Sequence, residues 1–144
     1  MQNEPRLGCG AAIVVDGRLL LVQRRTDPEA GCWGLPGGKV DLFEPAADAV
    51  RREIAEEVGI AIDPVDLLCV VDQIDRATGM HWLSPVYRVD RYQGEPVNRE
   101  PGKHAAIGWF ALDALPASLT TPTRTAIAAL ARRAGGPPDQ KPNP

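Results

Sequence analysis

The chain has 144 residues, 44% of them hydrophobic, which suits one compact domain and leaves little room for two. Its formal net charge of −3 argues against a protein that holds a nucleic-acid polymer through many phosphate contacts. No apolar run reaches the roughly 18 residues of a membrane-spanning helix, so we expect none. The three cysteines are widely spaced without a CxxC pair, so we expect reduced thiols in a cytoplasmic protein, not a disulfide framework or a zinc site.

Apolar patterning and turn residues predict seven elements. In chain order they are a strand over 9–15, a strand over 19–24, a helix over 45–58, strands over 65–74, 81–89 and 106–111, and a helix over 123–133. The Asp16-Gly17 pair between two apolar runs predicts a tight hairpin. Pro45 suits the first turn of the first helix, and Gly59 suits the left-handed position just past its end. We expect loops over 25–34 and 93–96.

The order strands, helix, strands, helix predicts an α+β fold, an α/β/α sandwich around a mixed sheet. We expect a single domain over residues 6–134. Residues 1–5 and 135–144 are expected to be flexible tails, since the second of these is rich in glycine and proline.

The first predicted helix carries an unusual cluster of acids. Glu53, Glu56 and Glu57 stand at i, i+3 and i+4, so they share one face and repel one another. The last two also lie where the helix dipole disfavours negative charge. A bound divalent cation would explain why three acids share this unfavourable place, since hard cations bind carboxylate oxygens. The alternative is a solvated acidic face. A separate apolar stripe should pack on the core: Ala47, Val50, Ile54 and Val58.

The residues around this helix follow a longer pattern. The segment from Gly38 to Ile60 matches GX5EX7REUXEEXGU at every specified position, where U is a large aliphatic residue. This pattern is the Nudix box, and the preceding Trp33 to Gly38 also resembles the usual lead-in of that family. The chain therefore resembles the Nudix hydrolases, and its expected strand order agrees with their fold over nearly all of residues 6–134.

The resemblance implies that the acidic helix presents its glutamates to one to three Mg²⁺ ions, with Mn²⁺ able to substitute. Glu56 and Glu57 would be direct ligands, and Glu53 would bind through a shared ion or water or act as the general base. Arg52 would hold Glu53 by a charge-assisted hydrogen bond. The carbonyl of Gly37 or Gly38 would add an oxygen ligand. The resemblance gives structural roles to two further residues of the box: Glu44 and Gly59.

Outside the box, relatives often supply one more acid from a late loop. Glu100 occupies that place, as an extra ligand or catalytic base, while Glu95 competes with it and an exposed turn glutamate is the alternative. Weaker candidates for substrate binding are Arg24, Lys39, Trp82 and Lys103. Trp82 could stack on a base, although a half-buried tryptophan is commoner, and Arg24 could equally be surface charge. His104 has no histidine or cysteine at ligand spacing and is not assigned to a metal.

The resemblance favours a MutT-like nucleoside triphosphate pyrophosphohydrolase that releases a nucleoside monophosphate and pyrophosphate. The alternatives are cleavage of ADP-ribose, a nucleotide sugar or a dinucleoside polyphosphate, or a non-catalytic nucleotide sensor. Residues 75–78 lack the proline or tyrosine that ADP-ribose or dinucleoside enzymes tend to carry there. Residues 116–120 lack the asparagine that reads oxidised guanine. We expect a nucleotide substrate, no nucleic-acid or membrane partner, and a monomer or homodimer.

Overall fold

The computed structural model describes residues 2–135, which form two helices and nine strands. In chain order these are β1 (Arg6–Val15), β2 (Arg18–Arg24), β3 (Trp33–Gly34), β4 (Gly37–Lys39), α1 (Ala46–Val58), β5 (Ala61–Ile62), β6 (Asp66–Asp75), β7 (Met80–Val89), β8 (Tyr92–Gln93), β9 (His104–Ala111) and α2 (Thr121–Gly135). All seven predicted elements are present, and the largest shift is at β1, which begins at Arg6 instead of Cys9. The sequence missed β3, β4, β5 and β8, because two or three residues are too few to show an alternation.

The predicted mixed sheet is confirmed. Its strands follow the order β3-β2-β1-β7-β6, with β4 paired to β1 and β9 paired to β2. The pairing of β1 with β7 is parallel, and the other pairings in this sheet are antiparallel. The predicted hairpin joins β1 to β2, with φ of 53° at Asp16 and 72° at Gly17. Positive φ at both central residues is typical of the tight turn that matches strand twist.

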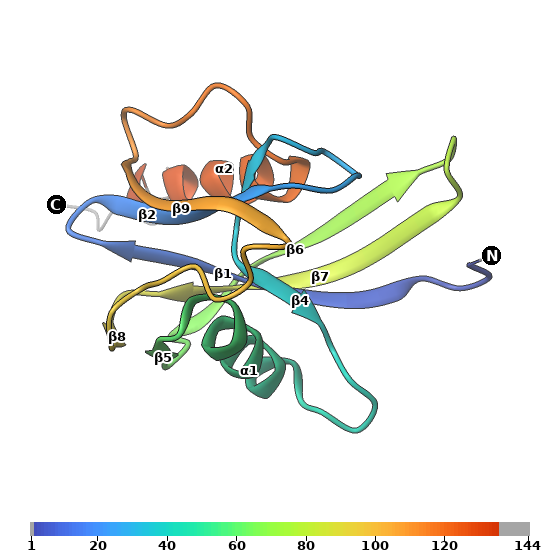
Figure 1. The fold of residues 1–144 in the computed structure, drawn as a ribbon, viewed down its shortest axis with the longest axis horizontal. Helices are drawn as coiled ribbons and strands as arrows, with labels where there is room; N and C mark the ends of the chain where they lie inside the picture. The colour runs from blue at the N-terminus through green and yellow to red at the C-terminus, as the bar shows by residue number, and fades with distance from the viewer. Residues whose placement is uncertain (1, 136–144) are drawn as a thin grey trace, which may run out of the picture.

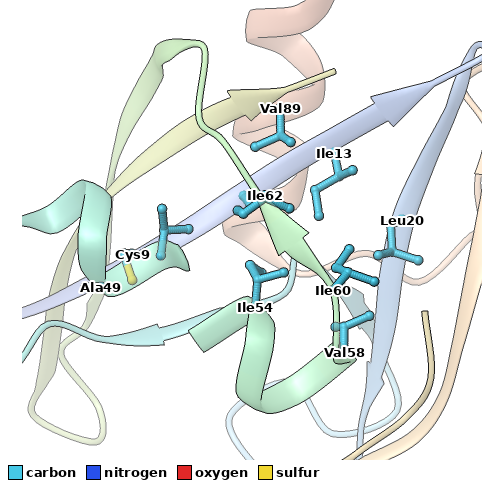
Figure 2. Close-up of a cluster of buried hydrophobic side chains, with 11 residues drawn as sticks. Cys9, Ile13, Leu20, Ala49, Ile54, Val58, Ile60, Ile62 and Val89 are labelled. Carbon is cyan, nitrogen blue, oxygen red and sulfur yellow. The ribbon is translucent and has the colours of Figure 1, made fainter. Parts of the chain in front are cut away.

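The two helices cover opposite faces of the sheet, as the predicted sandwich requires (Figure 1). One buried cluster joins α1 to β1 and includes Ile13, Val50 and Ile54, part of which is drawn in Figure 2. The other joins α2 to the opposite face and includes Leu21 and Ala126. No helix within residues 2–135 is both long and apolar enough to cross a membrane.

The packed stripe of α1 differs from the predicted one. Ala47 is only half-buried, whereas Ala49 and Glu57 are buried with Val50. Seven residues fall about 20° short of two full helical turns, so Glu57 lies almost directly above Val50. One of the three predicted acidic residues therefore lies on the core side of α1. Gly59 ends this helix in the left-handed conformation, with φ of 72°, as predicted.

The ends of the chain were predicted to be flexible. Residues 136–144 and Met1 lie outside the described part of the chain. Within it, the Gln2 side chain exchanges hydrogen bonds with the backbone of His81 at the start of β7. All three cysteines lie in the described part and are free thiols.

Candidate active site

A glycine strand brings the acidic helix against the sheet. β4 pairs with β1 through the partners Cys9 and Gly38. A Cβ atom at Gly37 would collide with the carbonyl oxygen of Cys9, and one at Gly38 would collide with the carboxylate of Glu53. Position 37 needs glycine because its backbone lies so close to the backbone of β1, and glycine at position 38 leaves space for the Glu53 carboxylate. The glycines thus allow a carboxylate of α1 to lie directly on β4.

Arg52 connects the loop after β4 to the acidic face. Its Nε and Nη2 atoms donate to the two carboxylate oxygens of Glu44 at 2.8 and 2.9 Å. Its Nη1 atom donates to Glu53 Oε1 at 3.0 Å, and Nη2 also donates to the carbonyl of Lys39 at 2.9 Å. The hydrogen bonds from Arg52 lower the pKa of Glu44 to about 2, so that carboxylate stays ionised. The bidentate pair with Glu44 fixes the Arg52 guanidinium, which then orients Glu53 through a single hydrogen bond.

Glu57 is the buried acid of this site, with 5% of its surface exposed. One hydrogen bond from the backbone N–H of Gly37 reaches Glu57 Oε2 at 3.2 Å. The pKa of Glu57 is raised to about 8, chiefly by burial, which outweighs the hydrogen bond from Gly37; the nearby charges of Glu53 and Glu100 act in the same direction as burial. Lys103 acts in the opposite direction and offsets only part of this effect. Burial and the neighbouring acids therefore disfavour the ionised form of Glu57 in the absence of a cation.

The loop before β9 carries Glu100 to the same place. The backbone N–H of Arg99 donates to the carbonyl of Glu57 at 3.0 Å, which ties this loop to the end of α1. Lys103 Nζ lies 3.2 Å from Glu100 Oε2 as an ion pair, yet this buried oxygen accepts no hydrogen bond of acceptable geometry. The competing candidate Glu95 is exposed and does not line the cavity that Glu53 and Glu57 share. Of the two acids, Glu100 is the one that joins the cluster.

A cavity of about 670 Å³ opens beside these acids. Most of the predicted site residues line it: Arg24, Gly38, Lys39, Glu53, Glu57, Trp82 and Lys103. The others do not line it: Glu44, Arg52, Glu56, Gly59 and Glu100. Among them, Glu56 has about half of its side chain exposed, and its Oε2 atom lies 3.4 Å from Arg52 Nη1. Gly59 lies at a separate hollow below α1.

Several cavity residues were missed by the sequence analysis. They are contributed by different elements: Glu29, Gln73, Met80, Ser84, His104 and Thr120. The alternation of β7 offered a signal, since Met80 and Ser84 share a face with Trp82. No sequence pattern of this kind pointed to Glu29. It lies in the loop after β2 with φ of 62°, and its side chain accepts hydrogen bonds from Thr121 at the start of α2.

The chemistry of this donor set fits a hard divalent cation. Within residues 2–135 no group of three or more histidine, cysteine, aspartate or glutamate side chains is already gathered as a complete metal site. Glu53 and Glu57 nevertheless share the cavity wall, and Glu100 keeps a buried oxygen without a hydrogen bond. A cation among these oxygens would offset the burial and, to a smaller extent, the repulsion that raise the pKa of Glu57.

The raised pKa of Glu57 predicts an unusual pH dependence of the metal-free protein. Because the pKa of about 8 in the folded protein exceeds the ordinary glutamate value of 4.5, the folded state holds a proton that the unfolded state releases. Stability should be highest below about pH 4.5, as far as this group is concerned, and fall as the pH rises to 8. The free energy of unfolding should fall by a few kcal/mol at most over this pH range.

Thermal melting in chelator from pH 5 to 8 measures this effect, with Glu57→Gln as the matched control. Titration of all other groups is common to both proteins, so the difference between the two curves isolates Glu57. The parent should lose melting temperature relative to Glu57→Gln as the pH rises. Parallel curves would contradict the buried position of this acid.

Comparison with known proteins agrees with the fold and the box. The model of the NUDIX domain matches residues 5–130. The crystal structure of a MutT NUDIX hydrolase from Burkholderia pseudomallei has a TM-score of 0.87 and 59% identity, covering 89% of this chain and 99% of that one.

Two curated relatives are also similar. An ADP-ribose pyrophosphatase of Methanocaldococcus jannaschii is 36% identical over 112 residues, which are 78% of this chain and 65% of that protein. A putative 8-oxo-dGTP diphosphatase 2 of Mycobacterium tuberculosis is 38% identical over 101 residues, covering 68% of this chain and 67% of that protein. The chain thus spans about two thirds of the length of these curated relatives. With the complete box on α1 and the domain match over 5–130, the chain belongs to the NUDIX hydrolase family.

Proposed function

We propose that this chain hydrolyses the diphosphate linkage of a nucleoside triphosphate. One water is consumed, one bridging P–O bond breaks, and the products are a nucleoside monophosphate and pyrophosphate. The observation that carries the proposal is the shared cavity, in which the acids Glu53 and Glu57 face the same space as the cations Arg24, Lys39 and Lys103.

Different parts of the cavity would bind the metal ion and the substrate. The acidic end would hold Mg²⁺ or Mn²⁺ through Glu53 and Glu57, with Glu100 beside them and Glu56 joining from the solvent side. The bound cation would neutralise polyphosphate charge and lower the pKa of the attacking water. Either Glu53 or Glu100 would accept the proton of that water.

The cationic residues would contact the phosphates of the substrate. Charge-assisted hydrogen bonds from Arg24, Lys39 and Lys103 suit the anionic oxygens of a polyphosphate. Trp82 lines the same cavity and offers a face for a nucleobase. Thr120 occupies the wall near the start of α2, in the segment that lacks the asparagine, so we propose no preference for oxidised guanine.

Cleavage of ADP-ribose is the second candidate. The 36% identity to the Methanocaldococcus jannaschii ADP-ribose pyrophosphatase favours it. The similarity to the Mycobacterium tuberculosis protein favours a triphosphate instead. Both substrates contain the diphosphate linkage, so the same acidic cluster would serve either reaction.

Product analysis tests this proposal. The protein is incubated with Mg²⁺ and single substrates, namely the ordinary and deoxynucleoside triphosphates, 8-oxo-dGTP and ADP-ribose, and the products are separated by ion-exchange chromatography. We expect nucleoside monophosphate and pyrophosphate in equal amounts from at least one triphosphate. Glu57→Gln protein purified in parallel controls for contaminating phosphatases.

Other product patterns would contradict the proposal. Nucleoside diphosphate with orthophosphate would reject the predicted bond cleavage. Turnover confined to ADP-ribose would favour the second candidate, and nucleotide binding without any turnover would favour the non-catalytic sensor.

A further inference from the structure

Two buried side-chain atoms within residues 2–135 lack a hydrogen-bond partner, and they lie on the same turn. They are Oε2 of Glu100 and Nδ1 of His104. The backbone N–H of His104 donates to the carbonyl of Glu100 at 3.0 Å, so the two residues are joined through one turn of backbone. Folded proteins pair nearly all buried polar atoms, so two neighbouring exceptions need an explanation.

Asn98 holds this turn in shape. Its Nδ2 atom donates to the carbonyl of His104 at 2.9 Å, and its Oδ1 atom accepts from the backbone N–H of Glu100 at 3.2 Å. His104 is also paired with Arg24 across the sheet, at the irregularity between β9 and β2. The backbones of Glu100 and His104 are therefore fixed relative to each other by contacts that do not involve their side chains.

The two atoms without hydrogen bonds are chemically complementary, although Oε2 is also in an ion pair with Lys103. An ionised carboxylate can only accept hydrogen bonds, while a neutral imidazole has one N–H donor and one acceptor nitrogen. His104 is 6% exposed, and burial lowers its pKa, which favours the neutral ring. A proton on Nδ1 would leave Nε2 as the acceptor nitrogen and give Glu100 a donor on its own turn.

We propose that His104 is a positioning residue whose Nδ1–H donates to Glu100 Oε2 through one bridging water, since the two atoms do not hydrogen-bond to each other directly. This contact would restrain the Glu100 carboxylate, whose Oε2 also forms the ion pair with Lys103 at 3.2 Å. This inference rests on the proposed function only for its catalytic consequence. Groups that orient a reactive carboxylate typically change activity by about 10- to 100-fold when removed.

Substitutions that place an amide nitrogen near one ring nitrogen at a time test whether Nδ1 is the donor. The amide nitrogen of asparagine falls near the position of Nδ1, and that of glutamine falls near Nε2. We expect His104→Gln and His104→Leu to lower kcat by about 10- to 100-fold with KM changed less than about threefold. His104→Asn should keep most of the activity. If His104→Gln is active and His104→Asn is not, the ring acts through Nε2 and the proposal is overturned.

His81 supplies the matched control, since the chain has two histidines. It is partly exposed, is hydrogen-bonded to Asp72 at 3.0 Å and does not line the cavity. His81→Asn and His81→Gln should leave kcat unchanged. A melting curve of each variant shows that it is folded, and the comparison of His104→Asn with His104→Gln stands even where His104→Leu does not fold.

A double-mutant cycle asks whether His104 acts through Glu100. In a Glu100→Gln background, His104→Gln should cost almost no further activity. Full additivity of the two losses would overturn the proposal, because it would mean that the residues act independently.

Nuclear magnetic resonance reads the hydrogen bond without any turnover. Long-range ¹H–¹⁵N correlation of the two histidine rings, assigned with His81→Asn, should show His104 protonated on Nδ1. Its signal should shift in Glu100→Gln while that of His81 stays in place. A proton on Nε2, or no response to Glu100→Gln, would overturn the proposal. Loss of the proposed function would instead appear as an inactive parent protein with these ring signals intact.

Discussion

Glu57→Gln is expected to lower kcat by about three orders of magnitude. The amide keeps nearly the same shape and still accepts the hydrogen bond from Gly37, but it lacks the charge that a hard cation prefers. The loss should fall on kcat, because the missing charge acts where negative charge develops in the transition state. Steady-state kinetics at saturating Mg²⁺ measures it.

Two further substitutions on α1 sharpen this test. Asp48→Asn removes a carboxylate from the exposed first turn, where it pairs with Arg51, and should leave kcat near the parent value. Glu56→Gln tests whether the exposed third acid is a direct ligand, as the family resemblance implies. A near-normal kcat in Glu57→Gln would mean that the buried acid is structural and that the acidic face has another role.

Removal of divalent cations is expected to abolish turnover, with recovery on addition of Mg²⁺ or Mn²⁺. The carboxylates of Glu53 and Glu57, which line the cavity, would repel a polyphosphate bound there unless a cation lies between them. The measurement is product release in chelator, followed by titration with each metal chloride. Full turnover in metal-free buffer would rule out the proposed chemistry.

Melting curves supply a second, activity-independent readout of the same site. A ligand that binds only the folded state raises the melting temperature. Mg²⁺ should therefore stabilise the parent more than Glu57→Gln, while Asp48→Asn should respond as the parent does. An equal Mg²⁺ shift in all three proteins would place the cation elsewhere.

Sequence patterns that depend on neighbouring residues predicted much of this protein. The hairpin at Asp16-Gly17 and the helix ending at Gly59 follow from spacings of a few residues, and the family resemblance implied the hydrogen bond between Arg52 and Glu53. The box residues of α1 share a short segment, so their proximity was available without the fold. The mixed sheet between two helix layers followed from the order of elements and the family resemblance.

Contacts between distant segments were decided by the tertiary structure. Glu100 meets Glu57 because the loop before β9 hydrogen-bonds to the end of α1, and no local pattern encodes that contact. His104 and Thr120 enter the cavity only when β9 and the start of α2 are placed against β2 and β3. The burial of Glu57 likewise depends on what packs over α1, since helical spacing sets the direction of a side chain but not its access to water.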